Sequence, residues 1–128
     1  MSEVRGLALV LDDGLSLWGG MDPASGRIID AHHPQVGASL AGRVVVMPSG
    51  RGSSSSASVL AEAARAGTSP AAFLLEEPDL ILAIGAAVAE ELYGILVPVV
   101  VVAAEVRKEI EDGAPITIGA DGTVRWVH

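Results

Sequence analysis

The sequence predicts an α/β fold in which a partly parallel β-sheet is covered by helices. Three observations lead to this prediction. Apolar runs typical of buried strands alternate with helical segments between residues 44 and 102, as in βαβ units. Half of the residues are hydrophobic, which is enough to bury a core. Hairpin signals flank this central part on both sides, so antiparallel strands are expected at both ends of a single domain, residues 1–128.

The N-terminal third is expected to contain a β-hairpin and then a long irregular segment. The apolar run Leu7 to Leu11 ends at an Asp-Asp-Gly turn signal, and Leu15 to Trp18 would be the return strand. Residues 18–34 are rich in turn formers, and only Arg27 to Asp30 is expected to be a strand. Long structured loops in small domains often carry function.

The middle of the chain contains the clearest signals. Val44 to Met47 is an unbroken apolar strand, followed by a turn of small residues and a helix that ends at Gly67. The remaining elements are expected in the order strand, helix, strand, short helix and hairpin: Ala71 to Leu75, Leu80 to Tyr93 with Gly94 as its stop, Val97 to Val102, Glu105 to Asp112, Ile116 to Ile118 and Thr123 to Val127.

Composition excludes several function classes. The formal net charge of −8 argues against a nucleic-acid partner and against binding to an anionic membrane surface. The sequence has no cysteine, so it can supply neither a thiolate nucleophile nor thiolate ligands for zinc or an iron–sulfur cluster. The first residues lack a signal-peptide pattern, and the longest apolar stretch is interrupted by Glu90, Glu91 and Pro98. We therefore expect a cytoplasmic protein.

The segment RVVVMPSGRGSSSSASVLAEAARAG, residues 43–67, is the candidate functional site. A glycine turn between a strand and a helix directs backbone N–H groups at a ligand, and the helix dipole adds partial positive charge there. Gly50 and Gly52 lack a Cβ, so an anionic group could approach the backbone closely. Arg51 could clamp a carboxylate or face solvent. Ser53 is either a helix cap or a catalytic or anion-binding serine.

Known phosphate and hydrolase motifs do not fit this turn. A Walker loop requires a lysine before its last Ser or Thr, and no lysine is present here. Ser55 occupies the third glycine position of a dinucleotide-binding fingerprint, and no Gly-x-Ser-x-Gly elbow exists. The adjacent His32 and His33 do not share a face, so they are expected to be solvated or capping residues, and no metal site is predicted.

Three segments together resemble the small subunit, or swivel domain, of the aconitase X family. They read WGGMDPASGRIIDAHHP, LAGRVVVMPSGRGSSSSASVLAEAARAG and SPAAFLLEEPDLILAIGAAVAEELYGILVPVV, and they cover most of the chain. The resemblance implies the swivelling β/β/α fold of the aconitase and isopropylmalate dehydratase small subunits.

The resemblance also implies a role for the serine turn. The first serine of the corresponding turn is the catalytic base in these enzymes, and it matches Ser53 here. Gly50, Arg51, Gly52, Ser54 and Ser55 are then expected to bind a small carboxylate substrate. Aconitase has an arginine at the position of Ser55, and this departure argues for a substrate other than a tricarboxylic acid.

Family members dehydrate either cis-3-hydroxy-L-proline or mevalonate 5-phosphate. The turn GRGSSSSAS and the HHP segment are more similar to the bacterial hydroxyproline form. The resemblance further implies a large-subunit partner that holds an iron–sulfur cluster, with no cofactor bound by this chain. Two alternatives remain open from the sequence: a stand-alone module that binds an anionic metabolite, and an assembly protein whose serines only cap a helix.

Overall fold

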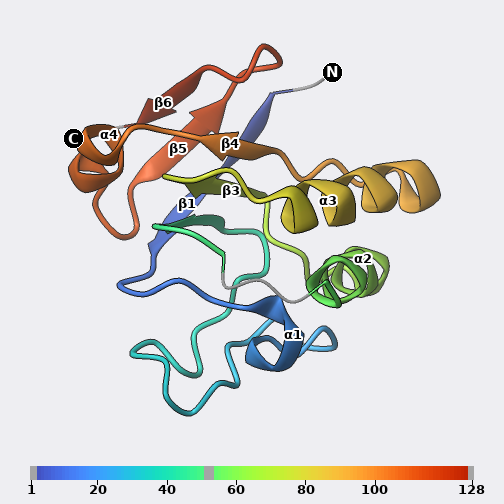
Figure 1. Ribbon diagram of the computed structural model, residues 1–128. Helices are drawn as coiled ribbons and strands as arrows, with labels where there is room; N and C mark the ends of the chain where they lie inside the picture. The colour runs from blue at the N-terminus through green and yellow to red at the C-terminus, as the bar shows by residue number, and fades with distance from the viewer. Residues whose placement is uncertain (1–2, 51–53, 127–128) are drawn as a thin grey trace.

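The computed structural model describes residues 3–50 and 54–126, and its strands form one six-stranded sheet in the order β4-β3-β2-β1-β5-β6. β1 to β4 are parallel, and β5 and β6 are antiparallel to their neighbours (Figure 1). The strands are β1 (Val4–Val10), β2 (Val44–Met47), β3 (Ala72–Leu75), β4 (Val99–Val101), β5 (Pro115–Ile118) and β6 (Val124–Trp126). The helices are α1 (Leu17–Gly20), α2 (Ser56–Ala66), α3 (Leu80–Tyr93) and α4 (Ala104–Glu109).

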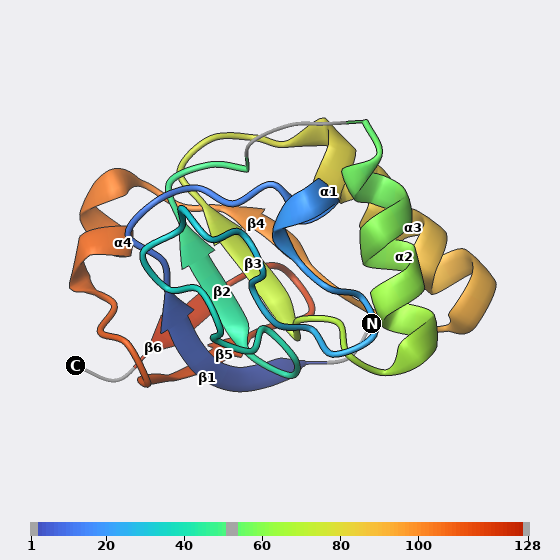
Figure 2. The same ribbon diagram turned by 90° about the horizontal axis from the view of Figure 1, so that it is seen from below.

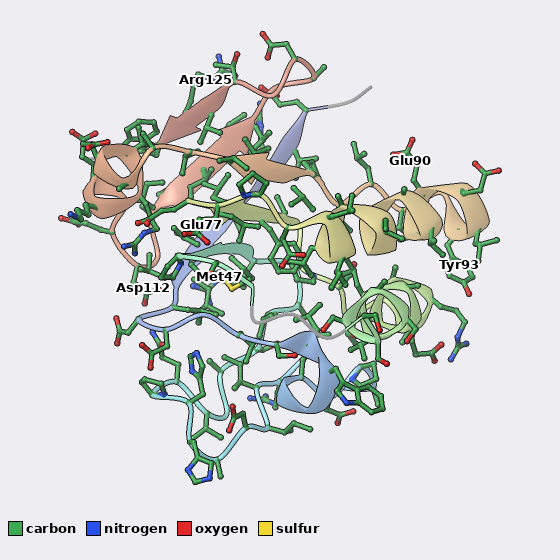
Figure 3. The ribbon with its side chains drawn as sticks, viewed as in Figure 1. Met47, Glu77, Glu90, Tyr93, Asp112 and Arg125 are labelled. Atoms are coloured by element: carbon green, nitrogen blue, oxygen red, sulfur yellow. The ribbon has the colours of Figure 1, made fainter. Side chains whose placement is uncertain are left out.

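Both faces of the sheet are buried, which explains the unbroken apolar runs of the central strands. Every residue of β2 and β3 is buried. Because side chains alternate along a strand, Val45 and Met47 of β2 enter one core and Val44 and Val46 enter the other. Figure 3 shows Met47 inside the molecule, between the sheet and the side on which α1 lies. These strands confirm the predicted central part of the fold.

The two cores define a three-layer arrangement. One core lies between the sheet and the layer formed by α1, α2, α3 and the loop 21–40, and it includes Leu17, Leu60 and Phe73. The second core joins β1, β2 and β3 to β5, β6 and α4. Ile116 of β5 and Leu74 of β3 belong to this second cluster, so the sheet curls over itself. The arrangement is the expected β/β/α architecture.

α2 and α3 lie side by side on the first face (Figure 1). Glycines with positive φ end both helices, Gly67 at 80° and Gly94 at 67°, as the sequence predicts. Asp79 caps α3 by accepting a hydrogen bond from the Leu82 backbone N–H at 3.0 Å. A Cβ at Gly85 would lie 3.0 Å from Ala57, which explains why the two helices can approach each other closely.

The predicted N-terminal hairpin is wrong. Residues Leu15 to Trp18 do not return along β1, because β1 pairs with β2 on one side and with β5 on the other. The Asp-Asp-Gly segment instead directs the chain across the edge of the sheet. There Leu15 forms an isolated parallel bridge with Gly50, and the one-turn helix α1 follows.

The predicted strand from Arg27 to Asp30 is also wrong. Ile28 and Arg27 form only isolated bridges, with Met21 and Ser39 respectively. Asp22 and Asp30 are turn residues, as predicted, since their carboxylates accept backbone N–H groups two residues later. The turns on both sides therefore leave too few consecutive residues for a ladder, and this segment is a compact loop.

The C-terminal part agrees with the prediction. Pro98 directly precedes β4, which forms the edge of the sheet, where a missing N–H is tolerated. β5 and β6 form a hairpin whose turn contains Gly122 in a left-handed conformation. Arg125 points outward from β6 in Figure 3. In residues 3–50 and 54–126, no helix has the length and apolar character needed to cross a bilayer.

Candidate active site at the carboxyl edge of the sheet

The four parallel strands end at one edge of the sheet, where α2 and α3 begin. Figure 2 shows the arrowheads of β1 and β2 directed toward this edge. In open α/β sheets, ligands bind outside the carboxyl ends of the strands. The predicted serine turn follows β2 and leads into α2, so it belongs to this edge. The fold therefore places the candidate site where such sheets bind ligands.

The structure describes part of the predicted site. Arg51, Gly52 and Ser53 lie outside the described residues. Ser54 is exposed and Ser55 is half-buried at the start of α2. The N-cap position belongs to Ser55, and the alternative in which Ser53 caps the helix concerns a residue outside those described. α2 has eleven residues, and its first turn carries no acidic side chain that would compete with an anionic ligand.

Gly50 is held between two neighbouring segments at the entry of the serine turn. On one side it bridges Leu15. On the other, a Cβ at Gly50 would lie 2.0 Å from Oδ2 of Asp79 and 3.2 Å from its Cγ. The other carboxylate oxygen of Asp79 caps α3, so this side chain is fixed. A glycine is thus required at position 50 because the Asp79 carboxylate approaches its backbone closely. The sequence alone does not reveal this contact.

Ser56 anchors the beginning of α2, a role that the sequence analysis missed. Its side chain is 3% exposed, and its Oγ accepts a hydrogen bond from the Trp18 backbone N–H at 3.1 Å. Ser16 Oγ lies 3.5 Å from the same atom. The run of four serines therefore combines different duties, since Ser56 is structural whereas Ser54 is open to solvent.

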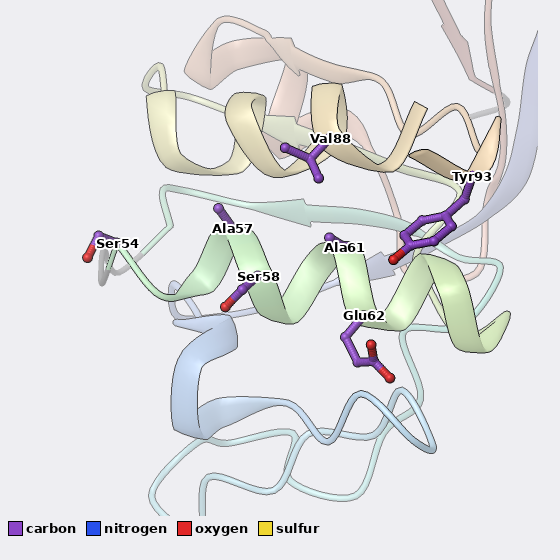
Figure 4. A pocket seen from close by; sticks show the side chains of 7 residues that line it. All are labelled: Ser54, Ala57, Ser58, Ala61, Glu62, Val88 and Tyr93. Atoms are coloured by element: carbon purple, nitrogen blue, oxygen red, sulfur yellow. The ribbon is translucent and has the colours of Figure 1, made fainter. Parts of the chain in front are cut away.

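A groove between α2 and α3 begins at Ser54 and extends to Tyr93 (Figure 4). Its volume is about 380 Å³, and small side chains such as Ala57 and Ala61 line it. Glu62 lies along it, hydrogen-bonded by Arg65, whose Nε contacts its two carboxylate oxygens at 3.1 and 3.0 Å. This hydrogen bond lowers the pKa of the Glu62 carboxyl. The groove is therefore lined by small and weakly polar groups apart from one ionised carboxylate.

The described part of the carboxyl edge is acidic. Asp12 and Asp13 follow β1, and Glu76 and Glu77 follow β3. Arg107 of α4 forms an ion pair with Glu76. Within the described residues, no group of three or more His, Asp or Glu side chains could hold a metal ion. The edge thus offers little positive charge of its own outside residues 51–53.

The two histidines follow the two predicted alternatives, a solvated or a capping residue. His32 is exposed, as expected of a solvated residue. His33 is 6% exposed and is the capping one, since its Nδ1 accepts a hydrogen bond from the Gln35 backbone N–H. Its other ring nitrogen lies within hydrogen-bond distance of the Asp13 backbone oxygen. An adjacent pair of histidines gives no sequence signal for which of the two is buried.

Comparison with known proteins places this geometry in a family. Residues 1–126 match the family model described as the aconitase X swivel domain. The chain belongs to the aconitase X swivel-domain family. The holo-form crystal structure of Thermococcus kodakaraensis aconitase X has the same fold, with a TM-score of 0.85 at 28% identity, and the match covers 99% of this chain and 92% of that one. The predicted family and swivel fold are therefore confirmed.

Two curated relatives illustrate the range of the aconitase X family. A cis-3-hydroxy-L-proline dehydratase of Pseudomonas aeruginosa is 53% identical over 97 residues, which are 76% of this chain and 17% of the relative. A phosphomevalonate dehydratase small subunit of Methanothermobacter thermautotrophicus is 36% identical, in a match that covers 95% of this chain and 90% of the relative. This chain thus spans less than a fifth of the Pseudomonas protein, but nearly all of the archaeal small subunit.

Proposed function

We propose that this chain is the swivel subunit of a hydro-lyase that dehydrates cis-3-hydroxy-L-proline together with a large subunit. The observation that carries the proposal is the 53% identity to the Pseudomonas aeruginosa hydroxyproline dehydratase, against 36% to the Methanothermobacter small subunit. The Methanothermobacter relative is named as a small subunit, and this name supports a large-subunit partner that supplies the rest of the active site.

In the proposed reaction Ser53 is the base. Its Oγ, as the alkoxide, takes the proton from the carbon next to the substrate carboxylate, and the electron pair of that C–H bond forms a double bond to the neighbouring carbon. The hydroxyl group on that neighbouring carbon leaves with the C–O electron pair as hydroxide. Over the full cycle the proton taken up by Ser53 converts this hydroxide to water, which returns Ser53 to the alkoxide. Backbone N–H groups of Gly52 to Ser55, before the first turn of α2, hold the carboxylate and the negative charge that develops on it. Gly50 and Arg51 complete the substrate-binding turn.

Departure of the hydroxyl requires an electrophile that this chain does not supply. The sequence has no cysteine, so its residues do not fit an iron–sulfur cluster. We assign such a cluster to the large subunit. In this proposal the swivel subunit removes the proton and binds the carboxylate, and the large subunit promotes departure of the hydroxyl.

Charge supports the choice of substrate. Hydroxyproline is a zwitterion, whereas mevalonate 5-phosphate carries a carboxylate and a phosphate. Asp12, Asp13, Glu77 and Asp79 lie at the described carboxyl edge, and the negative potential of such an edge disfavours the additional negative charge of a phosphorylated substrate. The second candidate, a phosphomevalonate dehydratase small subunit, is supported by the 36% identity to the archaeal relative, in a match that covers 95% of this chain.

The substrate choice is tested with the assembled pair of chains under anaerobic conditions. We expect kcat/KM for cis-3-hydroxy-L-proline to exceed that for mevalonate 5-phosphate by at least about a hundredfold, because a site that pairs the polar groups of one substrate leaves those of the other without partners. The reverse order would establish the second candidate. Binding of either compound by this chain alone, with no complex formed, would instead support a stand-alone binding module.

The outer face of α3 supports the presence of a partner. Leu80, Ile84 and Leu92 follow one another along this face and are 73%, 48% and 63% exposed. Leu80 directly follows Asp79, which contacts Gly50, so the apolar face is continuous with the serine turn. Exposed apolar patches of this kind typically mark protein interfaces. We propose that the large subunit, which must cover the serine turn, also covers this face.

Leu80→Asp should weaken the complex without weakening the subunit. Leu80 is the first residue of α3, where an added carboxylate interacts favourably with the helix dipole. Burying a leucine contributes about 1.5–3 kcal/mol, so the dissociation constant should rise about 10- to 100-fold. Isothermal titration calorimetry with the large subunit measures this change. Ile29→Asp, at a similarly exposed residue in the loop 21–40, is the control and should bind normally.

A further inference from the structure

A partly buried hydrogen-bond network joins the loop 31–36 to the end of β1 and the residues that follow it. His33 is 6% exposed, and its Nδ1 accepts a hydrogen bond from the Gln35 backbone N–H at 3.0 Å. Because Nδ1 accepts, a neutral imidazole carries its proton on Nε2. Nε2 lies 3.2 Å from the backbone oxygen of Asp13 and therefore donates to it. Both ring nitrogens of His33 are used in structural contacts.

Gln35 extends this network with its side-chain amide. Its Nε2 donates to the Val10 backbone oxygen at 2.6 Å, and its Oε1 accepts from the Asp12 N–H at 3.1 Å. Together with the bond to Asp13, two neighbouring side chains hold three backbone groups just after β1. The segment from Leu11 to Gly14 has no strand or helix of its own to fix it.

The segment fixed in this way contacts the serine turn. The Leu11 N–H donates to the Val46 backbone oxygen at 2.8 Å, which continues the pairing of β1 with β2. Leu15, two residues beyond Asp13, bridges Gly50. Asp79 closes the opposite side of Gly50. The entry of the serine turn therefore lies between Asp79 and the segment held by His33 and Gln35.

We propose that His33 is a positioning residue for the serine turn. Its bond to Asp13 fixes the segment that ends at Leu15, and the bridge from Leu15 to Gly50 holds the entry of the serine turn. The inference rests on the proposed function, in which Ser53 must meet a substrate held mainly by another chain. Misplacement of a reacting group by about 1 Å can reduce turnover about a hundredfold.

Two substitutions separate the two bonds of the imidazole. In His33→Gln the amide nitrogen can take the place of Nε2 and keep the donation to Asp13. In His33→Asn the amide oxygen can take the place of Nδ1 and keep the bond from Gln35, while the bond to Asp13 is lost. Each variant loses one neutral hydrogen bond, so their losses of stability should be similar. His32→Asn, at the exposed neighbour, is the control.

The first readout is turnover by the assembled pair of subunits. We expect His33→Asn to lower kcat about 10- to 100-fold with little change in KM, and His33→Gln to stay within about threefold of the wild type. Equal losses of kcat in the two variants, in step with their melting temperatures, would overturn the positioning role.

The second readout does not depend on activity. In the isolated chain, His33→Asn should speed backbone hydrogen exchange in peptides covering residues 11–15 and 48–50, and His33→Gln should do so less. Unchanged exchange at residues 48–50 in His33→Asn would contradict the proposal even if turnover fell. A wild-type pair of subunits that does not turn over cis-3-hydroxy-L-proline would instead refute the proposed function. The exchange measurement would still test whether His33 fixes the residues from Leu11 to Leu15 and Gly50.

Discussion

Replacing Ser53 with alanine should reduce turnover of the assembled enzyme about 10²- to 10⁴-fold, the range by which a positioned general base accelerates proton transfer. Alanine retains the small size of serine but has no oxygen to accept the proton. Substrate binding through backbone N–H groups should persist, so KM should change little. The measurement is kcat for cis-3-hydroxy-L-proline with the purified complex of both subunits.

Ser58→Ala is the matched control for this prediction. Ser58 lies on the exposed side of α2, where its Oγ donates to the Ser55 backbone oxygen at 2.8 Å. Its loss should leave kcat within about threefold, since it removes one exposed hydrogen bond to a backbone oxygen that still accepts from the Val59 N–H. Both variants should melt near the wild-type temperature and bind the large subunit normally. A Ser53→Ala enzyme with a third or more of the wild-type kcat would remove Ser53 from the role of base.

Replacing Gly50 with alanine should both destabilise the chain and inactivate the enzyme. The new Cβ would lie 2.0 Å from Oδ2 of Asp79, so either this carboxylate must leave the position in which it caps α3 or one of the two segments must move. Gly50 is not among the glycines with positive φ, so the effect is steric and not a matter of backbone conformation. Overpacking of this kind costs about 1–3 kcal/mol, which denaturant unfolding of the isolated chain would measure.

A double-mutant cycle attributes this effect to the contact with Asp79. Asp79→Ser keeps an oxygen that can cap α3 but is shorter, so it should leave room for the added methyl group. Gly50→Ala should therefore destabilise the Asp79→Ser chain much less than the wild-type chain. An equal loss of stability in both backgrounds would show that the close approach to Asp79 does not explain the glycine.

The parts of the fold that could be predicted from the sequence depend on local signals. β2 and β3 are short apolar runs because both of their faces are buried. α3 was predicted with its observed bounds, since it begins after the capping residue Asp79 and ends at Gly94. In each case the residues that determine the element lie within it or next to it.

The wrong predictions concern segments whose structure depends on distant partners. The turn after Leu11 has the composition of a hairpin, but the β5 strand, about a hundred residues later, occupies the edge of β1 that a return strand would need. The bridges of Arg27 and Ile28 likewise involve residues that no local pattern identifies. The structure of these segments depends on which distant strands they pair with, and local β-propensity carries no information about such pairing.

The candidate site likewise has features that local sequence predicts and features that depend on distant residues. Its position after β2 and before α2 was predictable from the apolar run, the glycines and the serines. The contact of Asp79 with Gly50, the anchoring bond from Trp18 to Ser56 and the network around His33 join segments far apart in the sequence. These contacts fix where the turn lies, and only the folded structure brings them together.

The central claim is that this chain contributes the base of a two-chain dehydratase. The most direct test assays cis-3-hydroxy-L-proline anaerobically with this chain alone, with the large subunit alone and with the two combined. We predict turnover only in the combined sample, and its loss when the Ser53→Ala chain replaces the wild type. Turnover by the large subunit alone, or by the combination containing Ser53→Ala at the wild-type rate, would contradict the claim.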